Sequence, residues 1–104
     1  ADSKSVEEAA LPSAYSLELP YPNPFNSTVL LRYALPEPSD IRMSVYDLTG
    51  QTIRRLIENE HDAGYFSVEW NGRDETGNQV SNGVYLISLK AGSFSDTSKV
   101  TLIK

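Results

Sequence analysis

Alternation of apolar and polar residues with a period of two most constrains the fold of this chain. Phe66, Val68 and Trp70, for example, alternate with Ser67 and Glu69. A β-strand places successive side chains on opposite faces, so such alternation is typical of half-buried strands. The pattern, in complete or shorter form, predicts seven strands, over residues 15–19, 29–35, 41–46, 52–57, 66–70, 85–89 and 95–103.

Turn-forming residues separate the predicted strands. Gly, Pro, Asn, Asp and Ser, which tolerate or preset turn conformations, gather at residues 36–39, 47–50, 62–64, 71–83 and 91–93. Seven short strands at this spacing, without a predicted interior helix, favour an all-β fold: an immunoglobulin-like antiparallel β-sandwich of about seven strands. The cysteine pair of antibody domains is absent, so the prediction concerns architecture alone.

Two segments outside the strands are distinctive. Residues 1–14 are rich in Ser, Glu and Ala and are expected to link a preceding domain to the sandwich of residues 15–104. The segment YPNPF, residues 21–25, is stiffened by two prolines and is predicted to be extended. We expect it to cross from one sheet to the other, with Tyr21 and Phe25 plugging the end of the core. An aromatic ligand platform is the alternative.

Composition excludes several classes of partner. Nine basic and fourteen acidic residues give a net charge of −5, whereas nucleic acids and anionic membranes require a basic surface. No apolar stretch approaches the about 20 residues of a membrane-spanning helix. The absence of cysteine excludes disulfides, thiolate metal ligands and a cysteine nucleophile. We therefore expect a monomer without nucleic-acid partners or membrane insertion.

The sequence offers little catalytic chemistry. His61 is the only histidine, no G-x-S-x-G motif is present, and NEHDAG is predicted to be a polar turn with a solvated histidine. The acidic residues fall mainly in turns and on exposed strand faces, which gives no pair of catalytic carboxylates. We predict no catalytic residue and no cofactor, and expect the protein not to be an enzyme.

The loop after Trp70 raises the question of calcium. Asp74, Glu75 and Asn78 lie close together in the sequence and carry oxygen ligands. The EF-hand pattern fails, because counting from Asp74 puts Gln79 at the glycine position. A turn is the favoured interpretation, with these three residues kept as weak calcium candidates.

A series of phrases in the sequence is similar to a known family. In order, these are YPNPFN, YALPEP, VYDLTGQTIRRL, AGYFSVEWNGRDETGN, SNGVYLISLKAG and SKVTLIK. Together they resemble the carboxy-terminal sorting domains of the type IX secretion system, and equally the related immunoglobulin-like domain of the flagellar hook-capping protein. The resemblance covers about residues 15–104, and its specificity comes from the ordered set.

The resemblance implies a function. Sorting domains of this kind end large secreted proteins and are recognised, as folded signals, by an outer-membrane translocon. The implied partners are that translocon and an N-terminal cargo domain of the same chain, and the implied location is secreted or cell-surface, reached through the periplasm. The residues that match the family motifs, and are therefore sorting-signal candidates, are Gly50, Gly83, Tyr85, Lys99 and Lys104.

Physical features accompany this resemblance and leave two alternatives open. The last predicted strand, flanked by Lys99 and Lys104, is expected at a sheet edge, where another protein can add a strand; lysine at an edge is also a standard guard against aggregation. A carbohydrate-binding or adhesive module would require an aromatic strip, for which Tyr46 and Tyr65 are outward candidates. A structural spacer beside a secreted enzyme is the other alternative to a sorting module.

Overall fold

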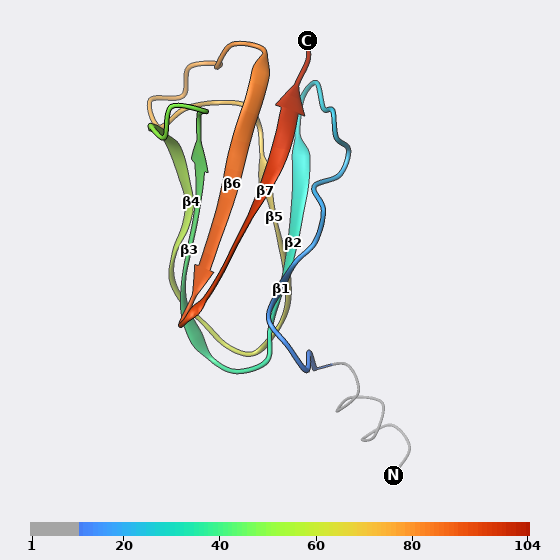
Figure 1. Cartoon of the computed structure of the whole chain (residues 1–104), viewed down its shortest axis with the longest axis vertical. Coiled ribbons are helices and arrows are strands. Elements are labelled where there is room, and N and C mark those ends of the chain that lie inside the picture. The colour runs from blue at the N-terminus through green and yellow to red at the C-terminus, as the bar shows by residue number, and fades with distance from the viewer. Residues whose placement is uncertain (1–10) are drawn as a thin grey trace.

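The computed structural model describes residues 11–104, which form seven strands and no helix (Figure 1). The all-β, immunoglobulin-like sandwich predicted from the alternation is thereby confirmed. Most of the predicted linker, residues 1–14, lies outside the described residues. The strands are β1 (Ser16–Leu17), β2 (Val29–Leu35), β3 (Ser39–Tyr46), β4 (Thr52–His61), β5 (Gly64–Trp70), β6 (Gly83–Ala91) and β7 (Phe94–Leu102).

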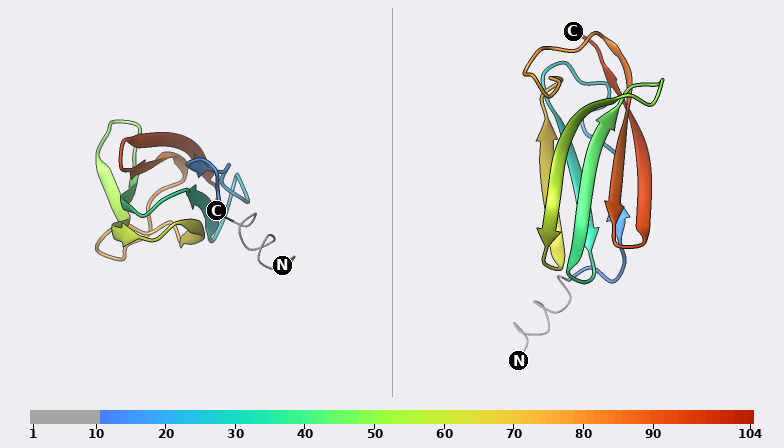
Figure 2. Two further views of the ribbon diagram at one scale, coloured as in Figure 1. Left: turned by 90° about the horizontal axis from the view of Figure 1, so that it is seen from below. Right: turned by 90° about the vertical axis from the view of Figure 1, so that its left-hand side faces the viewer.

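The strands pair in two antiparallel sheets that pack face to face (Figure 2). One sheet has the order β1-β2-β5 and the other the order β4-β3-β6-β7. The chain changes sheets at the turns after β2, β4 and β5, while β3–β4 and β6–β7 are hairpins within the larger sheet. None of the described residues forms a helix that is long and apolar enough to span a membrane.

The core lies between the sheets and follows the predicted alternation. In β6, for instance, Tyr85, Ile87 and Leu89 are buried, whereas the residues between them are only partly covered. Burial of such apolar surface is the main force that holds the two sheets together. The largest fully buried side chains are Trp70, Leu31, Leu35, Met43, Ile87, Leu89, Leu102, Val29, Val45 and Val100.

The two ends of the sandwich differ in what they carry (Figure 1). We call one the distal end; it holds the loops of residues 20–28, 47–51 and 71–82 together with residues 103–104. The opposite, proximal end carries the short turns after β2, β4 and β6, and there the chain enters from residue 11. The chain therefore enters the sandwich at one end and reaches Lys104 at the other.

The YPNPF segment corrects part of one prediction. It joins β1 to β2 of the smaller sheet, but on the way Tyr21 pairs with Leu30 of β2 and Phe25 pairs with Leu102 of β7, so the segment does span the two sheets as predicted. Phe25 is buried (2% exposed) as expected, but Tyr21 is 75% exposed. Tyr21 pairs through its backbone with Leu30, whose side chain lies outside the core, and this directs the tyrosine outward.

His61 corrects a second prediction. β4 continues four residues past the predicted end at Ile57, so His61 belongs to a strand and not to a solvated turn. There it is half-buried and packs edge-on against the ring of Phe66, with centroids 4.9 Å apart. Its Nε2 atom lies 3.3 Å from the hydroxyl of Tyr33. Burial raises the pKa of that tyrosine.

Candidate functional site

The interior of the distal end is built around two aromatic residues. Trp70, at the end of β5, is fully buried and meets the ring of Tyr85 edge-on, with centroids 5.3 Å apart. The indole Nε1 donates to the carbonyl of Arg73 (3.0 Å), and the hydroxyl of Tyr85 donates to the carbonyl of Ser81 (2.6 Å). A tyrosine near the start of this strand that bonds back to the preceding loop is the tyrosine corner of immunoglobulin-like sandwiches. Tyr85 thus has a structural role.

The two candidate glycines also have conformational roles. Gly50 has a φ of +91° in the β3–β4 turn, and Gly83 has a φ of +154° where β6 begins. Residues with a Cβ rarely adopt such angles, so both positions favour glycine. A Cβ at either position would meet no atom within 4 Å. The backbone, and not crowding, therefore explains both glycines.

Two loops of the distal end contain the same turn, which we had not predicted. Residues 47–51 read DLTGQ and residues 74–78 read DETGN. In the first, Oδ1 of Asp47 accepts bonds from the amide and hydroxyl of Thr49 and from the amide of Gln51. Asp74 makes the same three contacts with Thr76 and Asn78. The repeated pattern D-x-T-G-[QN] was the sequence signal that could have revealed them.

These hydrogen bonds change the acidity of both aspartates. The hydroxyl of Thr49 stabilises the ionised carboxylate and lowers the pKa of Asp47, with smaller help from the backbone amides. The hydroxyl of Thr76 lowers the pKa of Asp74 in the same way. Each carboxylate is thus an internal anchor of its own loop.

The calcium candidates do not converge on a common point. Asp74 uses Oδ1 within its turn, and the amide of Asn78 donates to the hydroxyl of Thr76 (3.0 Å). The carboxylate of Glu75 instead accepts the backbone amide of Arg55 on β4. Within residues 11–104, no three His, Asp or Glu side chains are grouped so that they could hold a metal ion. The geometry accounts for these three residues as loop anchors.

The YPNPF segment closes the distal part of the β7 edge. The amide of Phe25 donates to the carbonyl of Thr101, and its carbonyl accepts from the amide of Ile103, both at 2.9 Å. Beside it, the side chain of Asn23 donates to the carbonyl of Lys99 (3.1 Å) and accepts from the amide of Thr101 (2.9 Å). A carboxamide has the donor and acceptor of a peptide group. Asn23 therefore extends the pairing where the flanking prolines have no amide hydrogen to donate.

β7 is an edge strand, as expected, but little of it is open to another strand. Besides the contacts of Asn23 and Phe25, the amide of Thr97 is bonded to Oδ1 of Asp96 (2.8 Å). Side-chain caps of this kind and inward-pointing charges reduce edge-to-edge pairing. Asp96 caps the amide of Thr97. Because it lies opposite the inward-facing Leu89, it also places a charge on the inner face of the edge strand. The structure thus disfavours β7 as a site of strand addition.

Lys99 and Lys104 differ from the other candidates, because both side chains are exposed. Neither forms an ion pair among the described residues, and the backbone amide of Lys104 donates to the side chain of Asn82 (3.3 Å). Ile103 (53% exposed) and Tyr21 (75% exposed) present apolar surface at the same end of the molecule. Ile103 also lines a shallow hollow with Pro22, Pro24, Phe25 and Asn26.

The two outward tyrosines do not form an aromatic strip. Tyr46 ends β3 in the four-stranded sheet at the distal end and is half-buried. Tyr65, 61% exposed, begins β5 in the other sheet at the proximal end. Because the outer faces of two packed sheets point in opposite directions, the two rings cannot bind one ligand. This removes the sequence feature that favoured a carbohydrate-binding module.

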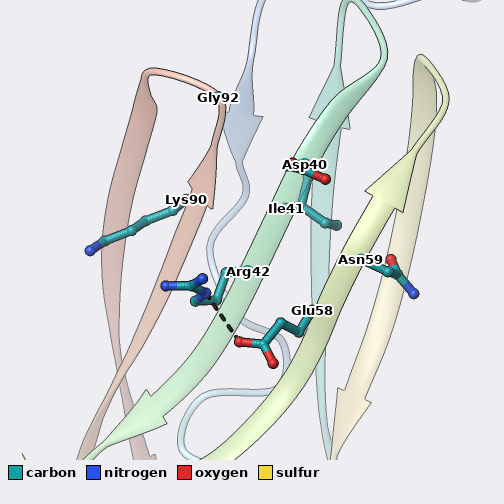
Figure 3. A pocket seen from close by; sticks show the side chains of 7 residues that line it. All are labelled: Asp40, Ile41, Arg42, Glu58, Asn59, Lys90 and Gly92. Atoms are coloured by element: carbon teal, nitrogen blue, oxygen red, sulfur yellow. Dashed lines mark ion pairs between the residues drawn. The ribbon is translucent and has the colours of Figure 1, made fainter.

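A second hollow lies on the outer face of the larger sheet (Figure 3). Its charged residues are Asp40, Arg42, Glu58 and Lys90, and Arg42 Nε lies 3.2 Å from Glu58 Oε2. Both members of this ion pair are more than half exposed. Two acids and two bases balance one another, so the hollow has no net charge with which to select a charged ligand. We assign it no chemistry.

With this geometry established, the family can be identified. The FlgD Ig-like domain family matches residues 25–95, well over half of the chain. The chain belongs to this family. No curated protein matches the sequence.

Solved structures agree with the FlgD Ig-like assignment. FlgD from P. aeruginosa is 27% identical over 71% of this chain, with a TM-score of 0.56. PorZ from Porphyromonas gingivalis, described as an essential bacterial surface component of the type IX secretion system, is 22% identical over 88% of this chain (TM-score 0.57). Dimeric latent PorU from the same organism is 16% identical over 88% (TM-score 0.65).

The chain corresponds to only part of each of these proteins. It spans 57% of the FlgD chain, 12% of the PorZ chain and 10% of the PorU chain. At 22% and 16% identity, the likeness to PorZ and PorU shows a shared fold alone.

Proposed function

We propose that this FlgD Ig-like domain is a non-catalytic sorting module, which directs a larger protein through the type IX secretion system to the cell surface. The ordered phrases from YPNPFN to SKVTLIK support this proposal. The fold shared with PorZ, a component of that system, is consistent with it. The partners would be an outer-membrane translocon and a cargo domain of the same chain.

One structural observation carries the proposal. Among the sorting-signal candidates, Gly50, Gly83 and Tyr85 are accounted for by backbone angles and by the tyrosine corner. Lys99 and Lys104 are not, because their side chains are exposed and make no ion pair in the described part of the chain. Surface charges without a structural use are candidates for binding. We therefore assign recognition by the translocon to these two lysines.

Their position suits recognition by a partner. Lys104 follows the distal end of β7, and Lys99 lies just past the middle of that strand, away from the proximal end where the chain enters from residue 11 (Figure 1). Exposed Tyr21 and Ile103 provide apolar surface at the distal end. A protein interface commonly combines an apolar centre with a charged rim. A cargo domain earlier in the chain would join the sandwich through residue 11, at the opposite, proximal end.

The experiment is a transfer test. Residues 15–104, fused to the end of an unrelated periplasmic reporter, should bring it to the surface of a host with a type IX system. The same fusion in a host without that system should remain periplasmic. Retention of the fusion in the periplasm of more than one competent host would contradict the proposal.

Point substitutions are better suited to this test than truncation. Removing residues 99–104 would delete Val100 and Leu102, which are fully buried, and would unfold the distal end. Lys99→Ala and Lys104→Ala leave the core intact. We expect their combination to reduce surface delivery of the fusion, whereas Lys90→Ala, an exposed lysine on the neighbouring strand, should not.

A structural spacer is the second candidate, and one observation favours it. The chain enters at the proximal end and reaches Lys104 at the distal end, an arrangement that suits domains joined in series (Figure 1). A spacer would be neither necessary for surface delivery nor able to transfer it. The fusion experiment therefore separates the two functions directly.

A further inference from the structure

Three of the four edge strands are protected against pairing with another chain. β1 has only two residues, the distal part of β7 is capped by Asn23 and Phe25, and the amide of Thr97 nearer its proximal end is bonded to Asp96. The distal part of β4 is covered by Glu75, whose amide donates to the carbonyl of Ile53 (3.1 Å) and whose carboxylate binds the amide of Arg55. Short edges, caps and charges are the means by which proteins prevent unwanted strand pairing.

The fourth edge, β5, is seven residues long and has no cap among residues 11–104, and its one charged residue is Glu69. Its seven residues, GYFSVEW, include no proline and no lysine, and aromatic and β-branched residues favour strand formation. Among residues 11–104, no hydrogen bond outside the β2–β5 ladder involves the backbone of β5. The longest unprotected edge of this sandwich is therefore also its most β-prone.

The register identifies the free backbone groups. Leu30 exchanges backbone hydrogen bonds with Tyr21, on the side of β2 that faces away from β5. Leu30 lies directly opposite Glu69, so these two residues form a non-hydrogen-bonded pair. Because backbone direction alternates along a strand, Tyr65, Ser67 and Glu69 direct their amides and carbonyls away from the sheet. These six groups are the open half of a β-ladder.

Apolar side chains beside this edge are incompletely covered. Phe66 and Val68 of β5 face the core but are only half-buried, as are Leu56 and Ile57 of β4. β4 and β5 run along the same side of the sandwich (Figure 2, right). The β5 sheet has three strands and the other sheet has four. A fourth strand beside β5 would cover this apolar seam.

Charge indicates the character of the incoming strand. Three acidic residues without an ion-pair partner among residues 11–104 lie along this side: Glu60 on β4, Asp62 in the turn and Glu69 on β5. All three are exposed and outnumber the one exposed base beside the edge, Arg32, which lies opposite Ser67. Glu58 is paired with Arg42, and the arginines of β4 lie nearer its distal end. Complementary charge accelerates association and selects partners. A basic strand is therefore favoured over an acidic one, and over a second copy of this acidic chain.

We propose that the open edge of β5 is a strand-addition site, which binds an extended segment of a partner protein in which apolar residues alternate with lysine or arginine. The segment becomes the fourth strand of the β1-β2-β5 sheet. Its backbone pairs with Tyr65, Ser67 and Glu69, its apolar side chains cover Phe66 and Val68, and its basic side chains lie beside Glu69. Main-chain bonds supply affinity in this mode and alternate side chains supply specificity. The proposal does not depend on a sorting function.

The test uses the 104-residue protein and an end-blocked octapeptide of alternating lysine and valine. Amide hydrogen exchange, resolved by residue, reports the outcome. We expect saturable binding that slows exchange at Tyr65, Ser67 and Glu69, while the exposed amide of Ser95 on β7 is unaffected. An octapeptide with glutamate in place of lysine should bind at least about tenfold more weakly, because attraction becomes repulsion. Equal binding of both peptides, or no slowing on β5, would overturn the proposal.

Ser67→Pro removes one outward amide and adds a ring at the edge, without touching the bonds to β2. It should weaken binding of the lysine–valine peptide by at least about tenfold. The matched variant Ser95→Pro makes the same change on the β7 edge and should leave binding unchanged. Should Ser67→Pro fail to fold, Glu69→Lys serves instead, with an expected weakening of about two- to fivefold.

Sedimentation of the protein alone tests whether a second copy of the chain pairs with the β5 edge instead. We expect a monomer at all concentrations, because the β5 edge and its surroundings are acidic. A concentration-dependent dimer that disappears in Ser67→Pro would overturn the proposal in favour of a second copy of the chain.

Discussion

The distal end of the sandwich has an inner and an outer layer with different tasks. The inner layer, Trp70, Tyr85 and Phe25, is buried and fixed by aromatic contacts and hydrogen bonds. The outer layer includes Lys99 and Lys104, whose side chains are exposed and unpaired among the described residues. Both layers contain residues of the family motifs. Motif membership alone therefore does not separate residues that maintain the fold from those available to a partner.

The largest effect is expected in the inner layer. Trp70→Ala empties a fully buried aromatic site and should lower the free energy of unfolding by about 3–5 kcal/mol, as measured by denaturant titration. The exposed Tyr65→Ala serves as the control and should change the same quantity by less than about 0.5 kcal/mol. A loss below about 1 kcal/mol for Trp70→Ala would show that the inner layer does not hold the distal end together.

The tyrosine corner should have an intermediate effect. Tyr85→Phe keeps the ring against Trp70 but removes the hydrogen bond to Ser81, which should cost about 1 kcal/mol in the free energy of unfolding. Tyr46→Phe, on the outer face of the larger sheet, is the matched control. If the two substitutions have equal effects, Tyr85 does not act as a corner, and its place in the motif requires another explanation.

The cap on β7 lies between the layers and should have a smaller effect. Asn23→Ala removes two hydrogen bonds at an exposed site, where water can replace them, so we expect a loss of about 0.5–1 kcal/mol. Exchange of the Thr101 amide should become faster. Asn26→Ala, three residues along the same loop, should alter neither quantity; an equal change in both variants would argue against capping by Asn23.

The paired turns predict a dependence on pH. The pKa values of Asp47 and Asp74 are lowered in the folded protein, so their contribution to stability is present above the unfolded value of about 4 and is lost as the pH falls below it. Melting temperatures between pH 7 and pH 3 should therefore decrease more steeply for the parent than for the double variant Asp47→Asn/Asp74→Asn. Parallel curves would show that these carboxylates are not anchors.

The sequence predicted the strands because their pattern is local. Inward-facing Phe66, Val68 and Trp70 recur every second residue, and this period is visible without any knowledge of the partner strands. Tyr21 and His61 were placed wrongly for a related reason. Their environments depend on pairing with Leu30 and Ser39, residues 9 and 22 positions away, which periodicity does not report.

The candidate site was predictable to a similar extent. Gly50 and Gly83 could be identified because glycine adopts backbone angles that other residues avoid. The capping by Asn23 could not, since its partner Lys99 lies 76 positions further along the chain. The protection of the other edge by Glu75 likewise depends on how the 71–82 loop meets β4. Such long-range polar contacts determine which edges remain open.

The most direct test of recognition through the outer layer measures stability and surface delivery for the same variant. The double variant Lys99→Ala/Lys104→Ala, in the reporter fusion, should change the free energy of unfolding by no more than about 1 kcal/mol, as expected for two surface substitutions. The surface fraction of the reporter should nevertheless fall close to that of a fusion without the domain. Surface delivery equal to that of the parent fusion, with stability also unchanged, would contradict recognition through the outer layer.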